Sequence, residues 1–346
     1  MTKVGKNTNT VLDWLLEPNN SDPLSVGVRY LALRDLVKDG GKELSKAKEK
    51  AHKEGPIAAL LAKMEKEGYW GKPGPGHFPL YFGTPWVLIL LAQLGADINL
   101  DRRIATACNY LLSNGMTNYG HFTTQGTPRG TWPCQQGNLC GSLLEIGCTD
   151  PRLDTAYEMM TRIVTGEGIA PLTDKKAPLR YYAAEMCGPG YACGGTYRQP
   201  CAWAAIKILL AFGKLPEEKR TPMMKTAIKM GVDFLLSVDP ATAAYPPGIS
   251  PKPNPRPSQN WWKFGFPSFY VADILENVEA LARLGYGQDP RLANAIQLIQ
   301  DKQDNQGRWL MEHNYADKIL VDFGPQKEPN KWVTLRALRT LQMVKC

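Results

Sequence analysis

The feature that most constrains the fold of this chain is a short pattern that recurs along its 346 residues. Each copy has an apolar residue and a glycine, followed by an aspartate, an arginine two positions later, an apolar residue and an alanine. The clear copies are Leu94, Gly95, Asp101, Arg103, Ile104, Ala107; Ile146, Gly147, Asp150, Arg152, Leu153, Ala156; and Leu284, Gly285, Asp289, Arg291, Leu292, Ala295. Glycine past a helix end takes up a left-handed backbone, and aspartate caps the next helix. The pattern therefore predicts repeated helical hairpins, with a looser fourth copy at Phe212-Gly213.

The two helices of each predicted hairpin differ in polarity. The first is apolar nearly all round and the second is charged on one side, which predicts an inner and an outer layer. Inner helices are expected near 23–38, 80–94, 134–146, 201–212, 267–284 and 330–344. Outer helices are expected near 42–66, 100–113, 151–164, 219–237 and 288–301.

Six inner helices predict an all-α protein in which the hairpins close into an (α/α)6 toroid around a central cavity. Residues 1–346 then form a single domain, and helices within residues 1–55 close the ring. An open solenoid also consists of hairpin repeats, but its repeat length is usually steadier than the spacing of these glycines.

A second signature follows the outer helices. Gln303, Gly307 and Trp309 define it as a glutamine, three residues, a glycine, one residue and a tryptophan. Variants of this spacing are Met64-Gly68-Trp70, Met116-Gly120-Phe122 and the stretched Gln125-Gly130-Trp132. With these motifs, roughly residues 55–345 resemble the α/α-toroid group that includes squalene-hopene cyclases and protein prenyltransferase β subunits.

The resemblance implies the toroid architecture but not the chemistry of these enzymes. The DxDD acid motif of squalene-type cyclases is absent, as are an Asp-rich diphosphate motif and the Asp-x-Cys zinc arrangement of the prenyltransferases. Their activities are therefore not transferred to this chain.

Composition narrows the choice of partners and compartment. The net charge is +8, but lysine and arginine are scattered, so nucleic acid is not an expected partner. The longest strongly apolar stretch, near Trp86 to Ala92, is too short for a membrane span. Without a secretion signal the protein is expected in the cytoplasm, with its eight cysteines as thiols. The sequence leaves the oligomeric state open.

Every long predicted loop joins an outer helix to the next inner helix, so the loops should meet at one rim of the ring. These loops are Trp70–Trp86, Tyr119–Cys134, Thr165–Cys201, Pro240–Pro267 and Trp309–Trp332. Since loops on a rigid scaffold often carry function, this rim is the predicted site.

Two cysteines occupy matching positions at this rim. Cys134 and Cys201 each follow a proline at the start of an inner helix. A helix N-terminus lowers the pKa of a thiol, which suits a nucleophile, an acid/base group or a metal ligand. The alternative interpretation is that both are ordinary core residues.

Zinc is the one cofactor that the cysteines suggest. Cys134, Cys187, Cys193 and Cys201, with Cys140 nearby, provide enough ligands, although no close Cys-x2-Cys pair is present. His77 or His313 would complete such a site or act as an acid or base. A hydrogen-bonding or surface role is the alternative for either histidine.

Two carboxylates are candidates for acid chemistry. Asp273 and Glu276 fall in a predicted apolar helix, where burial would raise the pKa of Asp273 and make it a general acid. Asp273 could equally cap or pair with a neighbouring helix. Glu312, beside His313, is a second candidate acid, and an exposed loop carboxylate is its alternative.

Aromatic residues of the rim suit an apolar substrate, and their faces can stabilise a cation. The candidates for substrate binding are Tyr81, Trp86, Trp203, Trp261, Trp262, Phe266, Phe269 and Tyr270. The leading hypothesis is a lyase, isomerase or cyclase that acts on a small terpenoid-like or alicyclic substrate. Alternatives are a glycosidase or polysaccharide lyase on the same fold, which would need paired carboxylates, or a non-catalytic binding protein.

Overall fold

A computed structural model describes residues 8–17, 23–168, 170, 173–176, 188–196, 198–245 and 259–345. This part of the chain is mostly helical, as predicted, and its strands β1 (Ala192–Cys193) and β2 (Gln199–Pro200) pair in an antiparallel ribbon. The α-helices are α1 Thr8–Leu16, α2 Val26–Ala32, α3 Lys42–Lys53, α4 Gly55–Ala62, α5 Thr84–Gln93, α6 Arg102–Asn114, α7 Pro133–Ile146, α8 Arg152–Thr165, α9 Ala202–Lys214, α10 Pro222–Leu235, α11 Ile274–Arg283, α12 Ala293–Asp301 and α13 Lys331–Met343.

The recurring aspartate and glycine play the predicted local roles. Asp101, Asp150 and Asp289 each accept a hydrogen bond from the backbone N–H two residues later, at 2.9, 2.9 and 3.0 Å. Each also pairs with the guanidinium of that residue, an arginine, at 2.7, 2.7 and 2.6 Å. The three glycines of these copies have φ of +78°, +95° and +90°. The hairpin pattern is confirmed in the three clear copies.

The glutamine-to-tryptophan signature also has a structural role. Trp70 and Trp309 each donate from the indole N–H to the carbonyl ten residues earlier, at 2.8 Å. Their backbone N–H groups donate to a threonine hydroxyl of the next inner helix, at 3.1 and 3.0 Å. Gly68 and Gly307 before them have φ of +98° and +82°. The signature thus ties an outer helix to the start of the next inner one.

Two expectations from these motifs are wrong. Gly213 lies inside α9 and does not end a helix, so the loose fourth copy does not share the glycine turn. Trp132 is the N-cap of α7, and Gly130 before it lacks a positive φ, so the stretched signature at Gln125 is not a true copy.

Three predicted helices have different bounds. The helix over 42–66 is split into α3 and α4, because Gly55 has a φ of +70° at the junction. The helix over 80–94 begins at Thr84. The helix over 267–284 begins at Ile274, where Asp273 is the N-cap.

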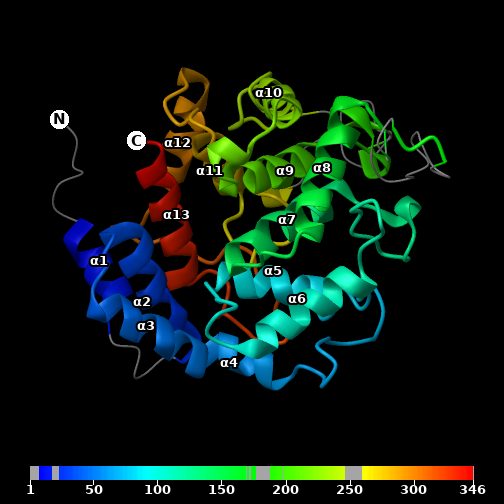
Figure 1. Ribbon diagram of the computed structural model, residues 1–346. Coiled ribbons are helices and arrows are strands. Elements are labelled where there is room, and N and C mark those ends of the chain that lie inside the picture. The colour runs from blue at the N-terminus through cyan, green and yellow to red at the C-terminus, as the bar shows by residue number, and fades with distance from the viewer. Residues whose placement is uncertain are drawn as a thin grey trace.

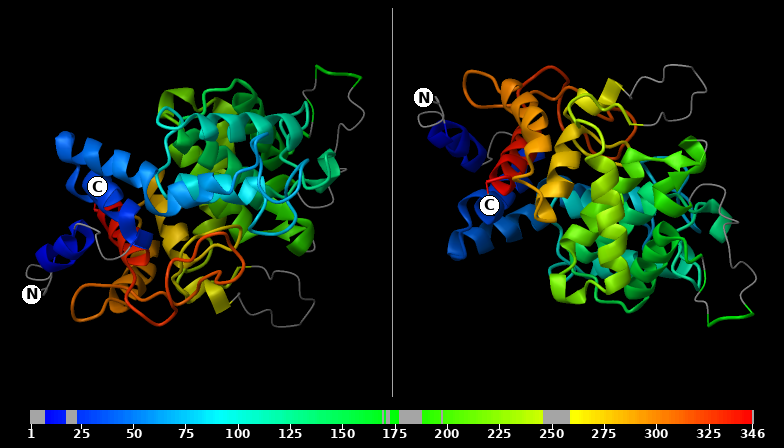
Figure 2. Two further views of the ribbon diagram at one scale, coloured as in Figure 1. Left: turned by 90° about the horizontal axis from the view of Figure 1, so that it is seen from below. Right: turned by 90° about the horizontal axis from the view of Figure 1, so that it is seen from above.

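Contacts between helices follow the predicted layers. Helix α5 contacts α7, α7 contacts α9, α9 contacts α11, α11 contacts α13, and α13 contacts α2. Helices α6, α8, α10 and α12 each contact the helix that precedes them in chain order, as partners in a hairpin do. Figure 1 shows these pairs following one another around the molecule. Figure 2 shows that the N-terminal helices α1, α2 and α3 (blue) lie together with α13 (red), on the side away from α7 and α8.

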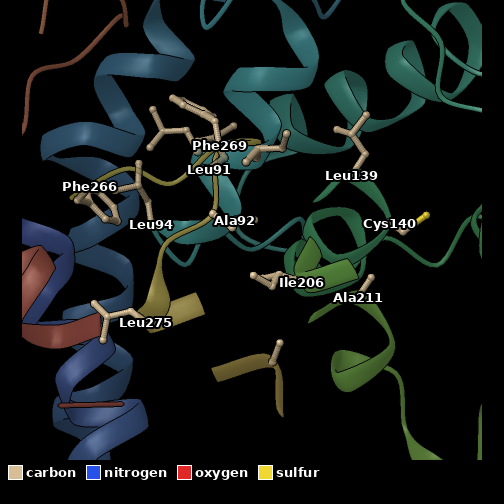
Figure 3. Packing of buried hydrophobic residues seen from close by; sticks show 14 of the residues in the cluster. Leu91, Ala92, Leu94, Leu139, Cys140, Ile206, Ala211, Phe266, Phe269 and Leu275 are labelled. Atoms are coloured by element: carbon tan, nitrogen blue, oxygen red, sulfur yellow. The ribbon is translucent and has the colours of Figure 1, made fainter. Parts of the chain in front are cut away.

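The apolar core consists largely of side chains from these packed helices. Leu91 of α5, Leu139 of α7 and Ile206 of α9 are at most 1% exposed, and Figure 3 shows them with their neighbours. In the described residues no helix combines the length and apolarity that a bilayer crossing requires. The inner layer is therefore held by burial against its neighbours, and it positions the loops that precede each inner helix.

Candidate functional site

Aromatic side chains from three loops and one helix gather at the N-terminal ends of the inner helices. Tyr81 and Trp86 come from the segment around the start of α5, Phe269 and Tyr270 precede α11, and Tyr315 precedes α13. Ring centroids of Tyr81 lie 5.1 Å from Phe269 and 4.7 Å from Tyr315, and Trp86 lies 5.7 Å from Phe269. We call these five residues the aromatic cluster. Tyr81 and Tyr270 are half-buried, whereas the other three are buried.

The eight predicted substrate-binding residues divide into two groups. Trp203 joins the aromatic cluster through Tyr270, with ring centroids 6.3 Å apart. Trp261 and Trp262 lie apart from it and donate to the carbonyls of residues 240 and 241 at 2.9 and 2.8 Å. Phe266 stacks on Trp332 at 4.6 Å. Tyr81, Trp86, Phe269, Tyr270 and Trp203 therefore lie together, and Trp261, Trp262 and Phe266 belong to other packing groups.

Two thiols lie next to Trp203. Cys193 in β1 and Cys201, the N-cap of α9, pack together with Trp203 at their side. The hydrogen bond from Cys201 lowers the pKa of Cys193 to about 7, although burial opposes this shift. The same hydrogen bond, with burial, raises the pKa of Cys201. The pair can therefore lose a proton near neutral pH, and Cys193 carries the charge.

The predicted lowering of the pKa of Cys134 and Cys201 is wrong. Burial raises the pKa of Cys134 to about 12, even though it stands in the first turn of α7. A helix terminus contributes roughly 0.3–1 kcal/mol, whereas desolvation of a buried charge costs several kcal/mol. Desolvation therefore determines the pKa of Cys134. The thiol with the lowered pKa is Cys193, which was not among the predicted catalytic residues.

The described cysteines do not form a metal site. In the part of the chain that the structure describes, no three His, Cys, Asp or Glu side chains are placed to hold a metal ion. Cys187, one of the predicted zinc ligands, lies outside the described residues. Cys140 is buried in the core, and its sulfur accepts a hydrogen bond from Gln136 at 3.6 Å.

His77 is a buried, neutral imidazole. Its ring lies 5.1 Å from Trp86 and 5.8 Å from Trp132, and burial lowers its pKa to about 4. Within the described chain, His77 Nδ1 and Gln135 Oε1 are buried atoms without a hydrogen-bond partner. His313 packs against Tyr315 at 5.0 Å, and burial also lowers its pKa. Burial therefore favours the neutral form of both histidines.

The predicted acids are held in ion pairs. Asp273 accepts a hydrogen bond from the Glu276 backbone N–H at 2.9 Å, and its carboxylate pairs with Arg336 at 3.1 Å. This is the capping and pairing role that was the alternative to a general acid. Glu312 pairs with Lys302 at 2.6 Å and also accepts from the Phe264 backbone N–H at 2.9 Å. Each carboxylate thus stabilises local structure.

A cavity between the inner helices is lined by charged side chains and not by the aromatic rings and thiols that the sequence predicts. It measures only about 80 Å³, and Phe266 is its one aromatic lining residue within the described chain. Its walls carry ion pairs, among them Lys207 with Glu276 at 2.6 Å and Arg283 with Glu279 at 2.9 Å. The charged lining residues are Glu145, Lys207, Lys214, Glu276, Glu279, Arg283, Arg336 and Arg339.

The sequence did not predict most of these ion pairs, which lie along the axis between the inner helices. Lys207 is 1% exposed, and it interrupts an otherwise apolar predicted inner helix. Burial raises the pKa of Glu276, and the ammonium of Lys207 opposes that rise. A lysine at the centre of an apolar helix was the available signal, because a buried charge requires a partner.

Comparison with known proteins gives little further information. No protein-family model matches the chain, and no curated protein matches it. Among solved structures it is similar to the type II terpene cyclase MstE from Scytonema in the apo form, at 13% identity and a TM-score of 0.30. That alignment covers 87% of this chain and 97% of the cyclase. A variant of that cyclase in complex with geranylgeranyl dihydroxybenzoate gives 14% identity, the same TM-score, and coverage of 87% and 96%. Such low scores leave function to be argued from the residues.

Proposed function

We propose that the inner helices form the inner layer of a closed (α/α)6 ring within a single domain. The order of contacts supports this arrangement, because α5, α7, α9, α11 and α13 touch in sequence and α13 touches α2. Helix α4 contacts both α2 and α5, which joins the two ends of that series. In such a ring the N-terminal ends of the inner helices, with the aromatic cluster, share one face.

On that face we propose the active site of a lyase or isomerase that acts on a small apolar substrate. The observation that carries this proposal is the position of Trp203, which contacts Tyr270 of the aromatic cluster and the thiol pair of Cys193 and Cys201. An apolar platform thus adjoins a group that can gain or lose a proton at neutral pH. These are the two requirements for proton transfer at carbon.

Exposed apolar side chains support an apolar ligand. Phe78 is 61% exposed and Leu80 is 37% exposed, in the segment that leads to Tyr81. Apolar side chains that remain in water beside an aromatic surface favour contact with an apolar molecule. Tyr81 and Tyr270, both half-buried, provide the accessible part of the cluster.

In the proposed reaction Cys193 is the general base. As a thiolate it takes a proton from an activated carbon of the substrate, and the resulting thiol returns a proton to another carbon. The proton count is unchanged over the cycle, so this is an isomerisation. Cys201 donates to the Cys193 sulfur and thereby stabilises the thiolate. Cys134, His77, Asp273 and Glu312 then shape the site and do not react.

Geranylacetone in D2O tests the proposal, because this terpenoid ketone has exchangeable protons beside its carbonyl. We expect the wild-type protein to bind it, as measured by tryptophan fluorescence, and to accelerate deuterium incorporation, as measured by mass spectrometry. Cys193→Ala should reduce exchange at least tenfold with binding retained, and Tyr270→Ala should weaken binding. Trp262→Phe, outside the cluster, is the matched control. Absence of binding, or equal exchange by wild type and Cys193→Ala, would contradict the proposal.

A non-catalytic binding protein is the second candidate. The observation in its favour is that the cavity between the inner helices has a volume of only about 80 Å³ and is lined by charged side chains, so little space remains there for a substrate. Under this candidate geranylacetone binds but no deuterium is incorporated above the background rate.

A polysaccharide-cleaving enzyme has less support. Such enzymes use two carboxyl groups that face each other across the substrate. Here Asp273 pairs with Arg336 and Glu312 with Lys302, so neither is available to face a second carboxylate.

A further inference from the structure

A second cavity lies at the opposite ends of the inner helices. It has a volume of about 600 Å³ and is lined by the last turns of α7, α9, α11 and α13 and by the turn that follows α2. We call it the basic mouth, because its lining holds five cationic side chains against two carboxylates. The cations are Arg34, Lys38, Lys214, Arg283 and Arg339, and the carboxylates are Asp35 and Glu145.

One carboxylate lies close to two guanidinium groups in the basic mouth. Asp35 Oδ1 lies 2.6 Å from Arg34 Nε, and Asp35 Oδ2 lies 3.2 Å from Arg339 Nε. The separation between Arg339 and Asp35 fits an ion pair, yet the buried Arg339 Nε makes no hydrogen bond with any described residue. Arg34 already donates to both oxygens of that carboxylate, at 2.6 and 3.0 Å.

The remaining charges leave an excess of positive charge. Lys214 pairs with Glu145, and Arg283 pairs with Glu279 of the inner cavity at 2.9 Å. Lys38 is exposed and forms no ion pair within the described ranges. Five cations thus face three carboxylates, which is a surplus of two positive charges around one cavity.

Helix ends alone do not account for these cations. Lysine and arginine often stabilise the last turn of a helix by donating to its free carbonyl groups. In the described chain, however, the hydrogen bonds of Arg34, Lys214 and Arg283 go to carboxylates. The buried Arg339 Nε is left without a hydrogen-bond acceptor among the described residues, and a planar anion in this cavity could accept from it and from a second guanidinium N–H.

We propose that the basic mouth binds a small molecule that carries two or more carboxylate or phosphate groups. The guanidinium groups of Arg34 and Arg339 hold one anionic group, and Lys38 at the edge of the cavity contacts another. The volume lies within the range of small-ligand sites, about 300–1,000 Å³. The cavity is separated from the aromatic cluster by the length of the inner helices, roughly 20 Å for the 14 residues of α7, so the two sites are distinct.

Isothermal titration calorimetry of the full chain, at constant ionic strength, tests this proposal with citrate and inorganic phosphate as probes. We expect saturable binding of at least one probe. Binding of citrate alone would identify carboxylates as the anionic groups of the ligand, and binding of phosphate alone would identify phosphates. Arg339→Gln and Arg34→Gln should each weaken binding about tenfold or more, and Lys38→Ala a few-fold. Loss of a charge-assisted hydrogen bond has effects of this size.

Lys229→Ala is the matched control. Lys229 is 72% exposed on α10 and is not part of the basic mouth, and its removal changes the net charge by the same single unit. Circular dichroism confirms that each variant is folded, and Lys38→Ala keeps the test valid because Lys38 is exposed. Equal weakening by Lys229→Ala, or no saturable binding of either probe at millimolar concentrations, would overturn the proposal.

Discussion

The two ends of the inner helices differ in whether their buried polar groups are neutral or charged. At the N-terminal ends, burial favours the neutral form of groups such as the His77 imidazole and the Cys134 thiol. Between the inner helices and at their C-terminal ends, charges such as Lys207 and Arg283 are buried together with a carboxylate partner. One layer of helices thus contains a region where burial removes charge and a region where pairing preserves it.

This difference shows where the stabilising core of the molecule lies. The inner helices are apolar where they pack against neighbouring helices, while the cavity between them is lined by ion-paired side chains. A buried ion pair contributes little net stability compared with apolar packing, but loss of one partner is costly. The axis should therefore be the region most sensitive to single charge changes.

The largest effect is expected from Lys207→Met at the axis. The substitution leaves Glu276 buried without its partner and should lower the free energy of unfolding by about 3–5 kcal/mol at pH 8. The loss should shrink as the pH falls, because burial raises the pKa of Glu276 and favours its neutral form. The double variant Lys207→Met with Glu276→Leu should recover much of the stability. Urea unfolding measures all three effects, and an unchanged stability of the single variant would show that the pair is not buried.

A second large effect is expected from two buried histidines when the pH falls. Burial lowers the pKa of His77 and of His121 to about 4, below the ordinary value of 6.5. The unfolded chain therefore binds more protons between pH 6.5 and pH 4, and stability falls as the pH drops through this range. Each histidine should account for about 3 kcal/mol when fully protonated in the unfolded state. Urea unfolding at pH 7, 6, 5 and 4 measures the slope.

The variant His77→Phe sharpens this test. It keeps the aromatic contacts with Trp86 and Trp132 but removes one titrating group. The part of the pH dependence that comes from the two histidines should fall by about half. An identical slope in the variant would mean that His77 is not buried in its neutral form.

A smaller effect is expected where α7 and α9 approach each other. A Cβ at Gly137 would lie 2.5 Å from the backbone carbon of Lys207, so Gly137→Ala must push the two helices apart. We expect a loss of about 1–3 kcal/mol, the usual range for overpacking. Gly126→Ala is not a suitable control because Gly126 has a φ of +76°, whereas Gly40→Ala meets no atom within 4 Å and serves well. Equal stability of the Gly137 and Gly40 variants in thermal unfolding would contradict the close packing.

The smallest change concerns the reactivity of Cys193. Because its pKa is about 7 and that of Cys134 is about 12, iodoacetamide at pH 7 should modify Cys193 at least tenfold faster than Cys134. Cys201→Ala removes the hydrogen bond and should move the midpoint of the rate profile to higher pH, while Cys201→Ser keeps a donor and should move it less. Peptide mass spectrometry measures each rate. Faster modification of Cys134 would reverse the assignment.

Much of the local structure could be predicted from the sequence because it depends on neighbouring residues. Asp101 and Asp289 bond to the backbone two residues later, and Gly95 and Gly285 have the left-handed backbone that ends a helix. The helix starts at Thr84 and Ile274 were less predictable, because apolar loop residues before them extend the apparent helical pattern.

The candidate site was only partly predictable, since thiol and carboxylate chemistry depends on surroundings that spacing does not specify. Cys134 has the expected position at a helix start, yet burial raises its pKa, and Cys193 has the lowered value because Cys201 lies against it. The sequence indicated that Asp273 is a candidate acid, but Arg336, 63 residues away, holds it in an ion pair.

The sequence by itself determined the hairpins, their caps and the division into an apolar and an amphipathic helix, since these follow from interactions within a few residues. Only the tertiary structure decided which charges meet. Lys207 with Glu276, and Lys214 with Glu145, are pairs whose members stand 69 residues apart. Coulomb attraction and desolvation depend on separation in space and on burial, and neither quantity is fixed until the helices have packed.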